Sequence, residues 1–180
     1  MSKVILFSGE AEHGKTASAK LLQKELESKS YKCLILSFAN YLKFICKTYY
    51  GWDGNKDEKG RHILQHVGTD IVRKRKPTFW VQTIIDFIKV FQNDYDYFII
   101  DDCRFPDEIT LFKDNDLFAF PIRVLRLNFE NKLTPEQRLH ASEKALDNYN
   151  FDYILTSESG LENLSIEINK LFNKYVGIYW

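Results

Sequence analysis

Residues 9–16 read Gly-Glu-Ala-Glu-His-Gly-Lys-Thr, which matches the pattern G-x-x-x-x-G-K-[ST] of the phosphate-binding loop, or P-loop. The apolar run Val4-Ile5-Leu6-Phe7 precedes the loop, and a stretch with leucines on one helical face follows it. This order of strand, loop and helix is the context that the motif requires. The N–H groups of the loop and the positive end of the following helix both favour a bound phosphate. The motif therefore predicts a nucleotide-binding α/β fold.

The P-loop also predicts individual contacts to a nucleoside triphosphate, with ATP and Mg²⁺ as the expected cofactors. Lys15 would reach the β- and γ-phosphates, and the hydroxyl of Thr16 would bind Mg²⁺. His13 is expected to be a variable position that faces solvent. The alternative for the motif is a glycine-containing turn before an ordinary helix. If the motif holds, the residues that contact the cofactor are Gly9, Glu10, Ala11, Glu12, His13, Gly14, Lys15, Thr16 and Ala17.

The bulk composition narrows the class of protein. The chain has 180 residues, enough for one domain over residues 1–180, and its 25 basic residues balance its 25 acidic residues. Because the net charge is zero, no global field favours nucleic acid or a membrane surface as a partner. No apolar run approaches the length of a membrane span. Three cysteines without metal-ligand spacing suggest a reducing compartment, so a cytoplasmic protein is expected, with a homodimer as one open option.

Short apolar runs alternate with helical patterns along the chain. The predicted strands are residues 4–8, 33–38, 97–100, 122–127 and 153–155. The predicted helices are residues 15–28, 40–50, 61–75, 79–92, 106–113, a helix that starts at the capping box Thr134-Pro135-Glu136-Gln137, and 161–172. This alternation predicts a three-layer P-loop NTPase fold, with a central parallel five-stranded sheet and helices on both faces. Residues 40–92 would form an acceptor-binding helical region, and residues 128–145 a lid.

Two acidic residues follow the predicted strand 97–100. Asp101 or Asp102 would lie near the P-loop at the carboxyl edge of the sheet and hold Mg²⁺, directly or through water. Spacing alone does not decide between them, and two acids that cap the following turn are the alternative. Arg104 lies two residues further on, and its planar guanidinium suits a second phosphate. Its alternative is a surface ion pair with Asp102.

Further cations are expected to serve an anionic acceptor or to cover the phosphates. Lys43 would lie one helical turn past the second strand, and Arg73 ends a predicted helix. Arg126 and Arg138 would belong to a mobile lid that excludes water, although exposed bases on a helical hairpin are the alternative. Trp80 lies on an apolar helical stripe, so it could wall a base pocket or simply pack in the core.

Several segments together resemble the phage and bacterial deoxynucleoside monophosphate kinase family, over nearly the whole chain. Related enzymes, including animal-type phosphomevalonate kinases, share a weaker version of the pattern. The matching pieces are the P-loop, Leu36-Ser37-Phe38-Ala39 with Leu42-Lys43, Leu64-Gln65-His66-Val67-Gly68-Thr69-Asp70 with Arg73, Phe79-Trp80-Val81, Ile100-Asp101-Asp102-Cys103-Arg104-Phe105-Pro106-Asp107-Glu108, His140-Ala141-Ser142-Glu143-Lys144-Ala145-Leu146-Asp147, and Phe151-Asp152-Tyr153.

The resemblance implies transfer of the ATP γ-phosphate to a deoxynucleoside monophosphate, and it favours Asp102 as the functional acid. The expected catalytic residues are Lys15, Asp102, Arg104 and Arg138. The expected substrate-binding residues are Lys43, Arg73, Trp80 and Arg104, and the expected Mg²⁺ residues are Thr16, Asp101 and Asp102. The Ser142-Glu143 pair would anchor the far end of the lid. The sequence departs from the family at Leu155-Thr156-Ser157-Glu158, where an Asn is often found, so adenine contacts at that edge are not carried over.

Three other functions stay open on the sequence. A kinase of the same fold could act on another phosphorylated metabolite, such as phosphomevalonate. A nucleotide-dependent binding switch would bind ATP or GTP and signal through moving loops, although the chain has no Asn-Lys-x-Asp guanine signature. A degenerate family member would serve only as a structural partner, which the intact P-loop argues against.

Overall fold

The computed structural model describes residues 3–176, so the two ends of the predicted domain 1–180 lie outside the described residues. Five strands form one sheet: β1 (Lys3–Ser8), β2 (Cys33–Leu36), β3 (Tyr97–Cys103), β4 (Phe118–Arg126) and β5 (Tyr153–Ser157). Eight α-helices surround it: α1 (Lys15–Ser28), α2 (Ala39–Tyr49), α3 (Glu58–Gln65), α4 (Phe79–Phe91), α5 (Asp107–Asp114), α6 (Pro135–Leu139), α7 (Ala141–Lys144) and α8 (Leu161–Leu171). Two π-helical segments, His66–Arg73 and Phe172–Val176, continue α3 and α8.

The sheet has the order β2-β3-β1-β4-β5, and every neighbouring pair is parallel. Strand β1 is therefore central, with β3 on one side and β4 on the other. Because parallel strands share one carboxyl edge, the P-loop after β1 lies beside the acidic end of β3. The predicted all-parallel, five-stranded, three-layer fold is confirmed.

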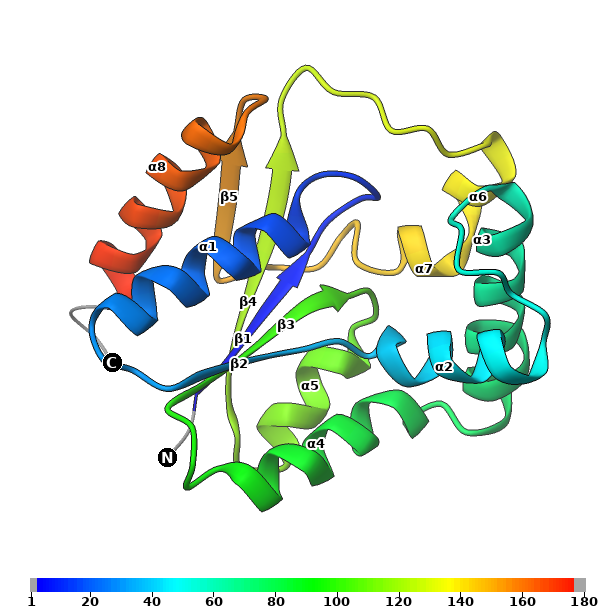
Figure 1. The fold of residues 1–180 in the computed structure, drawn as a ribbon, viewed down its shortest axis with the longest axis horizontal. Coiled ribbons are helices and arrows are strands. Elements are labelled where there is room, and N and C mark those ends of the chain that lie inside the picture. The colour runs from blue at the N-terminus through cyan, green and yellow to red at the C-terminus, as the bar shows by residue number, and fades with distance from the viewer. Residues whose placement is uncertain (1–2, 177–180) are drawn as a thin grey trace.

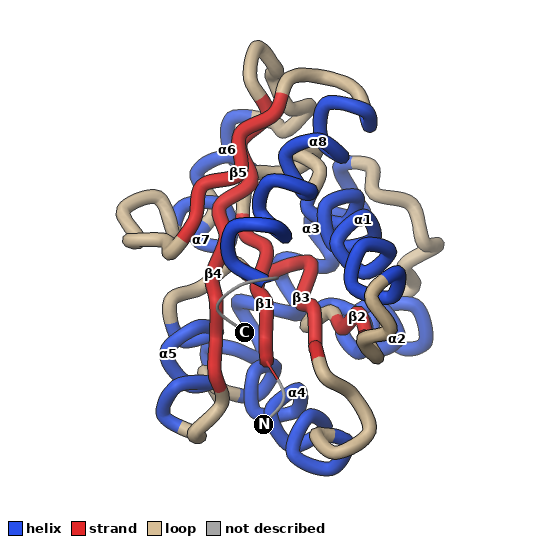
Figure 2. The backbone as a smooth tube through the Cα atoms, turned by 90° about the vertical axis from the view of Figure 1, so that its left-hand side faces the viewer, coloured by secondary structure: helices blue, strands red, loops and turns tan. Residues whose placement is uncertain are grey.

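The alternation of side chains along β1 builds the two faces of the sheet. Ile5 and Phe7 pack against a core that includes Leu22 and Leu26 of α1 and residues of α8. Val4 and Leu6 point to the other face, where α4 and α5 supply the core. Figure 1 shows α1 and α8 on one side of the strands and α4 and α5 on the other, and Figure 2 shows the strands side by side from a second direction.

The predicted helix 61–75 differs from the structure. Helix α3 begins earlier, because the carboxylate of Asp57 accepts a hydrogen bond from the backbone N–H of Gly60 at 2.7 Å and caps the helix. From His66 onward the chain winds with the wider π-helical turn. Gly68 lies in this segment, and a Cβ there would come within 2.7 Å of Leu42. A glycine therefore allows the close packing of the π-helical segment on α2.

Strand β4 also begins earlier than the predicted residue 122, since Phe118 to Pro121 pair with β1. A proline lacks the N–H that a central strand needs, which makes residue 121 look like a boundary. The Pro121 carbonyl accepts a hydrogen bond from the Asp152 N–H at 3.1 Å, on the side of β5. The ring nitrogen points to that same side, where β5 starts only at Tyr153, so no strand bond is lost.

Two leucines of α8 provide a matched test of the core between α1 and α8. Leu171 is fully buried, whereas Leu161 is 68% exposed. We expect Leu171→Ala to lower the free energy of unfolding by about 2–5 kcal/mol, because it removes buried methyl groups and leaves a cavity. Leu161→Ala should change it by less than about 0.5 kcal/mol, as exposed substitutions usually do. Urea denaturation of both variants measures this, and equal losses would contradict the assignment of the buried face.

Candidate active site

The P-loop wraps around its own lysine. Lys15 is buried, and its Nζ donates hydrogen bonds to the carbonyls of Gly9 and Glu10, each at 2.8 Å. Burial, reinforced by the nearby charge of Arg104, lowers the pKa of Lys15 to about 7. Gly9 has a φ of +150°, and a Cβ at this position would come within 2.5 Å of the Val124 carbonyl. Only glycine fits there, because the loop passes directly against β4.

His13 does not face solvent as predicted from its place in the motif. Its side chain is buried, because residues 126–131 fold over this part of the loop. Its ring accepts a hydrogen bond from the Arg126 N–H at 3.3 Å and meets the ring of Phe129 edge-on at 5.7 Å. Burial lowers the pKa of His13, so the neutral ring is the form that fits this place. The burial of His13 could not be predicted from the sequence, because the segment that covers its side chain lies more than 100 residues away in the chain.

The two aspartates near the end of β3 lie inside the strand, which runs beyond the predicted 97–100, and they have different partners. Asp101 accepts a hydrogen bond from the hydroxyl of Thr16 at 2.7 Å. Burial and the neighbouring charge of Asp102 raise the pKa of Asp101. These two oxygen-bearing groups suit Mg²⁺, which prefers hard oxygen ligands and uses few protein carboxylates.

Asp102 acts on α2 instead. Its carboxylate accepts hydrogen bonds from the hydroxyl of Ser37 at 2.6 Å and from the backbone N–H groups of Phe38 and Ala39, each at 2.9 Å. A carboxylate at a helix N-terminus binds free N–H groups and the positive end of the helix dipole. Asp102 therefore caps α2 from a neighbouring strand, and not the turn that follows β3, which was the alternative left open by the sequence.

Arg73 is fixed by three groups of the segment after β3. Its guanidinium donates to both carboxylate oxygens of Asp107, at 2.9 and 2.7 Å, and to Glu108 at 2.5 Å. It also stacks over the ring of Phe105 at 3.8 Å. Burial raises the pKa of Glu108 to about 8, against the opposing charge of Arg73 and two backbone N–H donors. The guanidinium of Arg73 is therefore held rigidly, and the carboxylate of Asp107 largely neutralises its charge.

Arg104 connects the sheet to the predicted lid. Its guanidinium donates to the Ser142 carbonyl at 3.2 Å and forms an ion pair with Glu143. Asn131 makes a second link, since its amide donates to the Glu10 carboxylate of the P-loop at 2.9 Å. The lid segment, residues 128–145, therefore contacts the P-loop at one end and Arg104, the residue after β3, at the other, and Figure 1 shows it crossing from the sheet toward α3.

Arg138 does not lie where a catalytic role would place it. Its guanidinium donates to the carbonyls of Leu133 at 3.1 Å and Asn131 at 2.9 Å, and it pairs with Glu130. It is not among the residues that line the cavity beside the P-loop. Arg126 likewise stacks over Phe129 at 3.9 Å rather than facing that cavity. Arg138 shapes the lid segment through its carbonyls and Glu130, whereas Arg126 donates to the hydroxyl of Ser159, after β5, at 3.3 Å.

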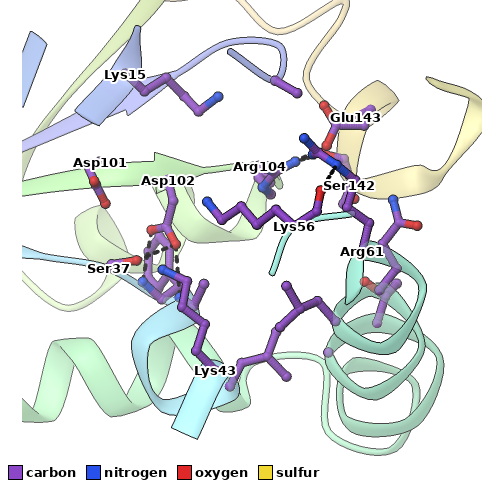
Figure 3. Close-up of a pocket in the computed structure, with 18 of the residues that line it drawn as sticks. Lys15, Ser37, Lys43, Lys56, Arg61, Asp101, Asp102, Arg104, Ser142 and Glu143 are labelled. Carbon is purple, nitrogen blue, oxygen red and sulfur yellow. Dashed lines mark hydrogen bonds and ion pairs between the residues drawn. The ribbon is translucent and has the colours of Figure 1, made fainter. Parts of the chain in front are cut away.

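A cavity of about 670 Å³ joins these groups, a size typical of a small-molecule site. Figure 3 shows Lys15, Asp101 and Asp102 on one side and Arg104, Glu143 and Arg61 on the other. Trp80 also lines the cavity; its ring is buried in the core and its N–H donates to the Gly68 carbonyl at 3.0 Å. The cations around the cavity are Lys15, Lys43, Lys56, Arg61, Arg73 and Arg104.

The structure brings together most of the predicted site. From the P-loop, the residues on the cavity wall are Ala11, Glu12, Gly14, Lys15, Thr16 and Ala17, whereas Gly9, Glu10 and His13 face other groups. Lys56 and Glu108 were missed as site residues. Lys56 lies in a polar segment that looks like an ordinary surface loop, and Glu108 was quoted only as part of a motif.

Comparisons with known proteins show the family and the fold of the chain. The family model described as deoxynucleotide monophosphate kinase matches residues 52–168. No curated protein matches the chain. The APS kinase CysC of Mycobacterium tuberculosis, solved with AMPPNP and APS, has a TM-score of 0.51 and 14% identity, over 96% of this chain and 98% of that chain. A sugar kinase from Janibacter sp. HTCC2649 has a TM-score of 0.52 and 12% identity, over 99% of this chain and 96% of that chain.

Fold and site together define a P-loop kinase. Because the family model covers more than half of the chain, the chain belongs to the deoxynucleotide monophosphate kinase family. It is therefore a phosphotransferase that binds nucleotides, as the resemblance implied. Within residues 3–176, no helix is long and apolar enough to cross a membrane.

The different partners of the two aspartates lead to a stability test. Asp102→Asn should lower the free energy of unfolding at pH 7 by about 1–3 kcal/mol, because it disrupts a charged cap with three donors. Asp101→Asn should leave that free energy unchanged or raise it. The folded state raises the pKa of Asp101, so its ionisation costs stability as the pH rises above the unfolded pKa. Urea denaturation of both variants checks this, and an equal loss in Asp101→Asn would contradict the assignment.

Proposed function

We propose that the protein transfers the γ-phosphate of ATP to the 5′-phosphate of a deoxynucleoside monophosphate, giving ADP and the deoxynucleoside diphosphate. One observation carries this proposal. The cavity that begins at Lys15 continues to Lys43, whose amine has only a 3.5 Å contact with Asn40, and to Arg104, which shares its guanidinium with Glu143; the phosphates of one nucleotide do not require these two cations. A second anionic substrate accounts for them. The family's description names the same substrate class, and a neighbour of the same fold was solved with AMPPNP.

The residues present fit Mg²⁺ at the P-loop side of the cavity. Thr16 and Asp101 would hold the ion, Asp101 directly or through water, and the bound ion would neutralise charge on the β- and γ-phosphates. Asp102 was the preferred acid on the sequence, but its carboxylate is engaged with α2. We therefore assign the Mg²⁺ role to Asp101 and the positioning of α2, which carries Lys43, to Asp102.

The acceptor needs no strong general base in this reaction. Its phosphate is largely a dianion at pH 7, because its second pKa is about 6. An acceptor oxygen forms the new bond to the γ-phosphorus while the bond to the β–γ bridging oxygen breaks, and ADP leaves. Lys15 binds the β- and γ-phosphates, and Lys43 and Arg104 hold the acceptor phosphate in line.

Arg73 and Trp80 are assigned to the wall of the acceptor pocket. The contacts of Arg73 with Asp107, Glu108 and Phe105 keep its guanidinium in one plane. A fixed guanidinium can hydrogen-bond an acceptor without losing conformational freedom. The ring of Trp80 would limit the space for the base, and Arg138 would only hold the lid segment in shape.

An acceptor panel tests the proposal. ADP release is measured with ATP, Mg²⁺ and dAMP, dGMP, dCMP, dTMP, dUMP, 5-hydroxymethyl-dCMP, the ribonucleotides or phosphomevalonate, with Lys15→Ala as the inactive control. We expect ADP formation that depends on a deoxynucleoside monophosphate, and a loss of at least about 10²-fold in Lys15→Ala. ADP formed only with phosphomevalonate would show that the acceptor is that metabolite and not a deoxynucleoside monophosphate. ADP formed without any acceptor would favour a nucleotide switch.

The lowered pKa of Lys15 predicts that nucleotide binding takes up a proton. At pH 8 a lysine with a pKa of about 7 is mostly neutral, and a bound triphosphate should raise that pKa and protonate the amine. Calorimetric titration with ATP at pH 8 in HEPES and in Tris, whose heats of ionisation differ, should therefore give different heats. Lys15→Arg, which stays charged, is the control and should give a smaller difference between the two heats. Equal heats in the unaltered protein would show that Lys15 is already charged.

A further inference from the structure

Lys56 is a cation of the cavity that no motif singled out. It lies between α2 and α3, and its side chain lines the same cavity as Lys15 and Lys43. Figure 3 shows its amine reaching across the cavity toward the side where Asp101 and Asp102 lie. Within residues 3–176, no hydrogen bond or ion pair engages this amine, so it can serve a substrate.

The loop that carries Lys56 is held in one conformation by its neighbours. The Trp52 ring N–H donates to the Asn55 carbonyl at 2.7 Å, and Asn55 donates to the carboxylate of Asp53 through its backbone N–H at 2.8 Å and its side chain at 2.9 Å. Gly60 packs against this turn, since a Cβ there would lie 2.0 Å from the Asn55 carbonyl. These contacts hold the backbone of Asn55, and they therefore fix the position from which the side chain of Lys56 starts.

Arg61 connects this loop to the P-loop. Its Nε donates to the Lys56 carbonyl at 3.0 Å, and its Nη2 pairs with the carboxylate of Glu12 at 3.2 Å. One guanidinium therefore fixes the backbone of Lys56 relative to the loop that receives the phosphates. The side chain of Lys56 projects from this support into the cavity.

The positive charges around the amine of Lys56 favour the binding of an anion in the cavity. Partial desolvation of this otherwise exposed side chain lowers the pKa of Lys56, and the positive charges of Lys43, Arg61 and Arg104 lower it further, opposed by Asp101. Like charges gathered around one space repel each other until a polyanion enters between them. The donor and acceptor phosphates of the proposed reaction would supply that polyanion.

We propose that Lys56 is a catalytic residue that contacts the transferred phosphoryl group between the donor and acceptor phosphates. This inference rests on the proposed function. The γ-phosphorus leaves the bridging oxygen of ADP and bonds to the acceptor oxygen. During this step the ammonium of Lys56 donates hydrogen bonds to the equatorial oxygens of the transferred phosphoryl group. The proton stays on the amine, so no other reactant is needed. The contact is strongest in the transition state, where charge spreads over those oxygens.

Lys59 provides a matched control for Lys56. Like Lys56 it is exposed; it lies in the first turn of α3 and is not among the residues that line this cavity. With the best acceptor of the panel, Lys56→Ala should reduce kcat by about 10²–10³-fold, the usual loss when one transition-state donor is removed. KM values should change much less, and the Tm should stay the same. Lys56→Arg should recover part of kcat, and Lys59→Ala should stay within twofold of the unaltered enzyme.

Each outcome decides the assignment. A kcat for Lys56→Ala within threefold of the unaltered enzyme overturns it, and so does a loss seen only in KM. If the Tm falls, Lys56→Met keeps the length of the side chain, and full kcat in that variant also overturns it.

An unaltered enzyme that is inactive with every acceptor refutes the proposed function instead. Binding of inorganic tripolyphosphate, measured by calorimetry, then tests the anion site alone. Weaker binding in Lys56→Ala than in Lys59→Ala supports it, and equal binding overturns it.

Discussion

The parallel pairing of β1 with β3 is the constraint on which the site depends. It brings the end of β3 beside the P-loop, so Thr16 meets Asp101 across 85 positions of sequence. The next residue, Asp102, then reaches the start of α2. One strand pairing therefore places the P-loop, the Mg²⁺ acid and the helix that carries Lys43. Successive residues of a strand point to opposite faces, which explains why two adjacent aspartates serve different elements.

The cavity gathers charges that oppose folding. Lys15 has a lowered pKa and Asp101 a raised one, which shows that the folded state disfavours the charged form of both groups. The acid pairs of Arg73 and Arg104 offset part of this cost by closing ion pairs around the cavity. A nucleotide and a second phosphate would satisfy the cations that remain. The core around α1, α4, α5 and α8 must supply the stability that the site lacks.

The accuracy of the sequence-based predictions follows the range of the interactions concerned. The P-loop, the strands and the capping box at Thr134 depend on residues close together in sequence, and the structure confirms that box. Most of the errors depend on distant partners; the start of α3 is the exception, because its cap, Asp57, is a local signal that the prediction missed. Leu42 alters the helix predicted at 61–75, the position of β5 lets Pro121 lie inside β4, and the lid segment buries His13.

The sequence by itself determined the class of fold and the phosphate-binding loop, because these follow from periodicity and from a motif with fixed spacing, and its resemblance to known enzymes implied the family. The tertiary structure decided how the charged residues divide their work. It paired Asp101 with Thr16, and it brought the carboxylate of Asp102 to the start of α2. It also directed the guanidinium of Arg138 to carbonyl groups of the lid segment. It also placed Lys56 in the cavity. A charged side chain pairs with whichever partner folding brings within hydrogen-bond distance. A single sequence does not predict which distant residue that will be.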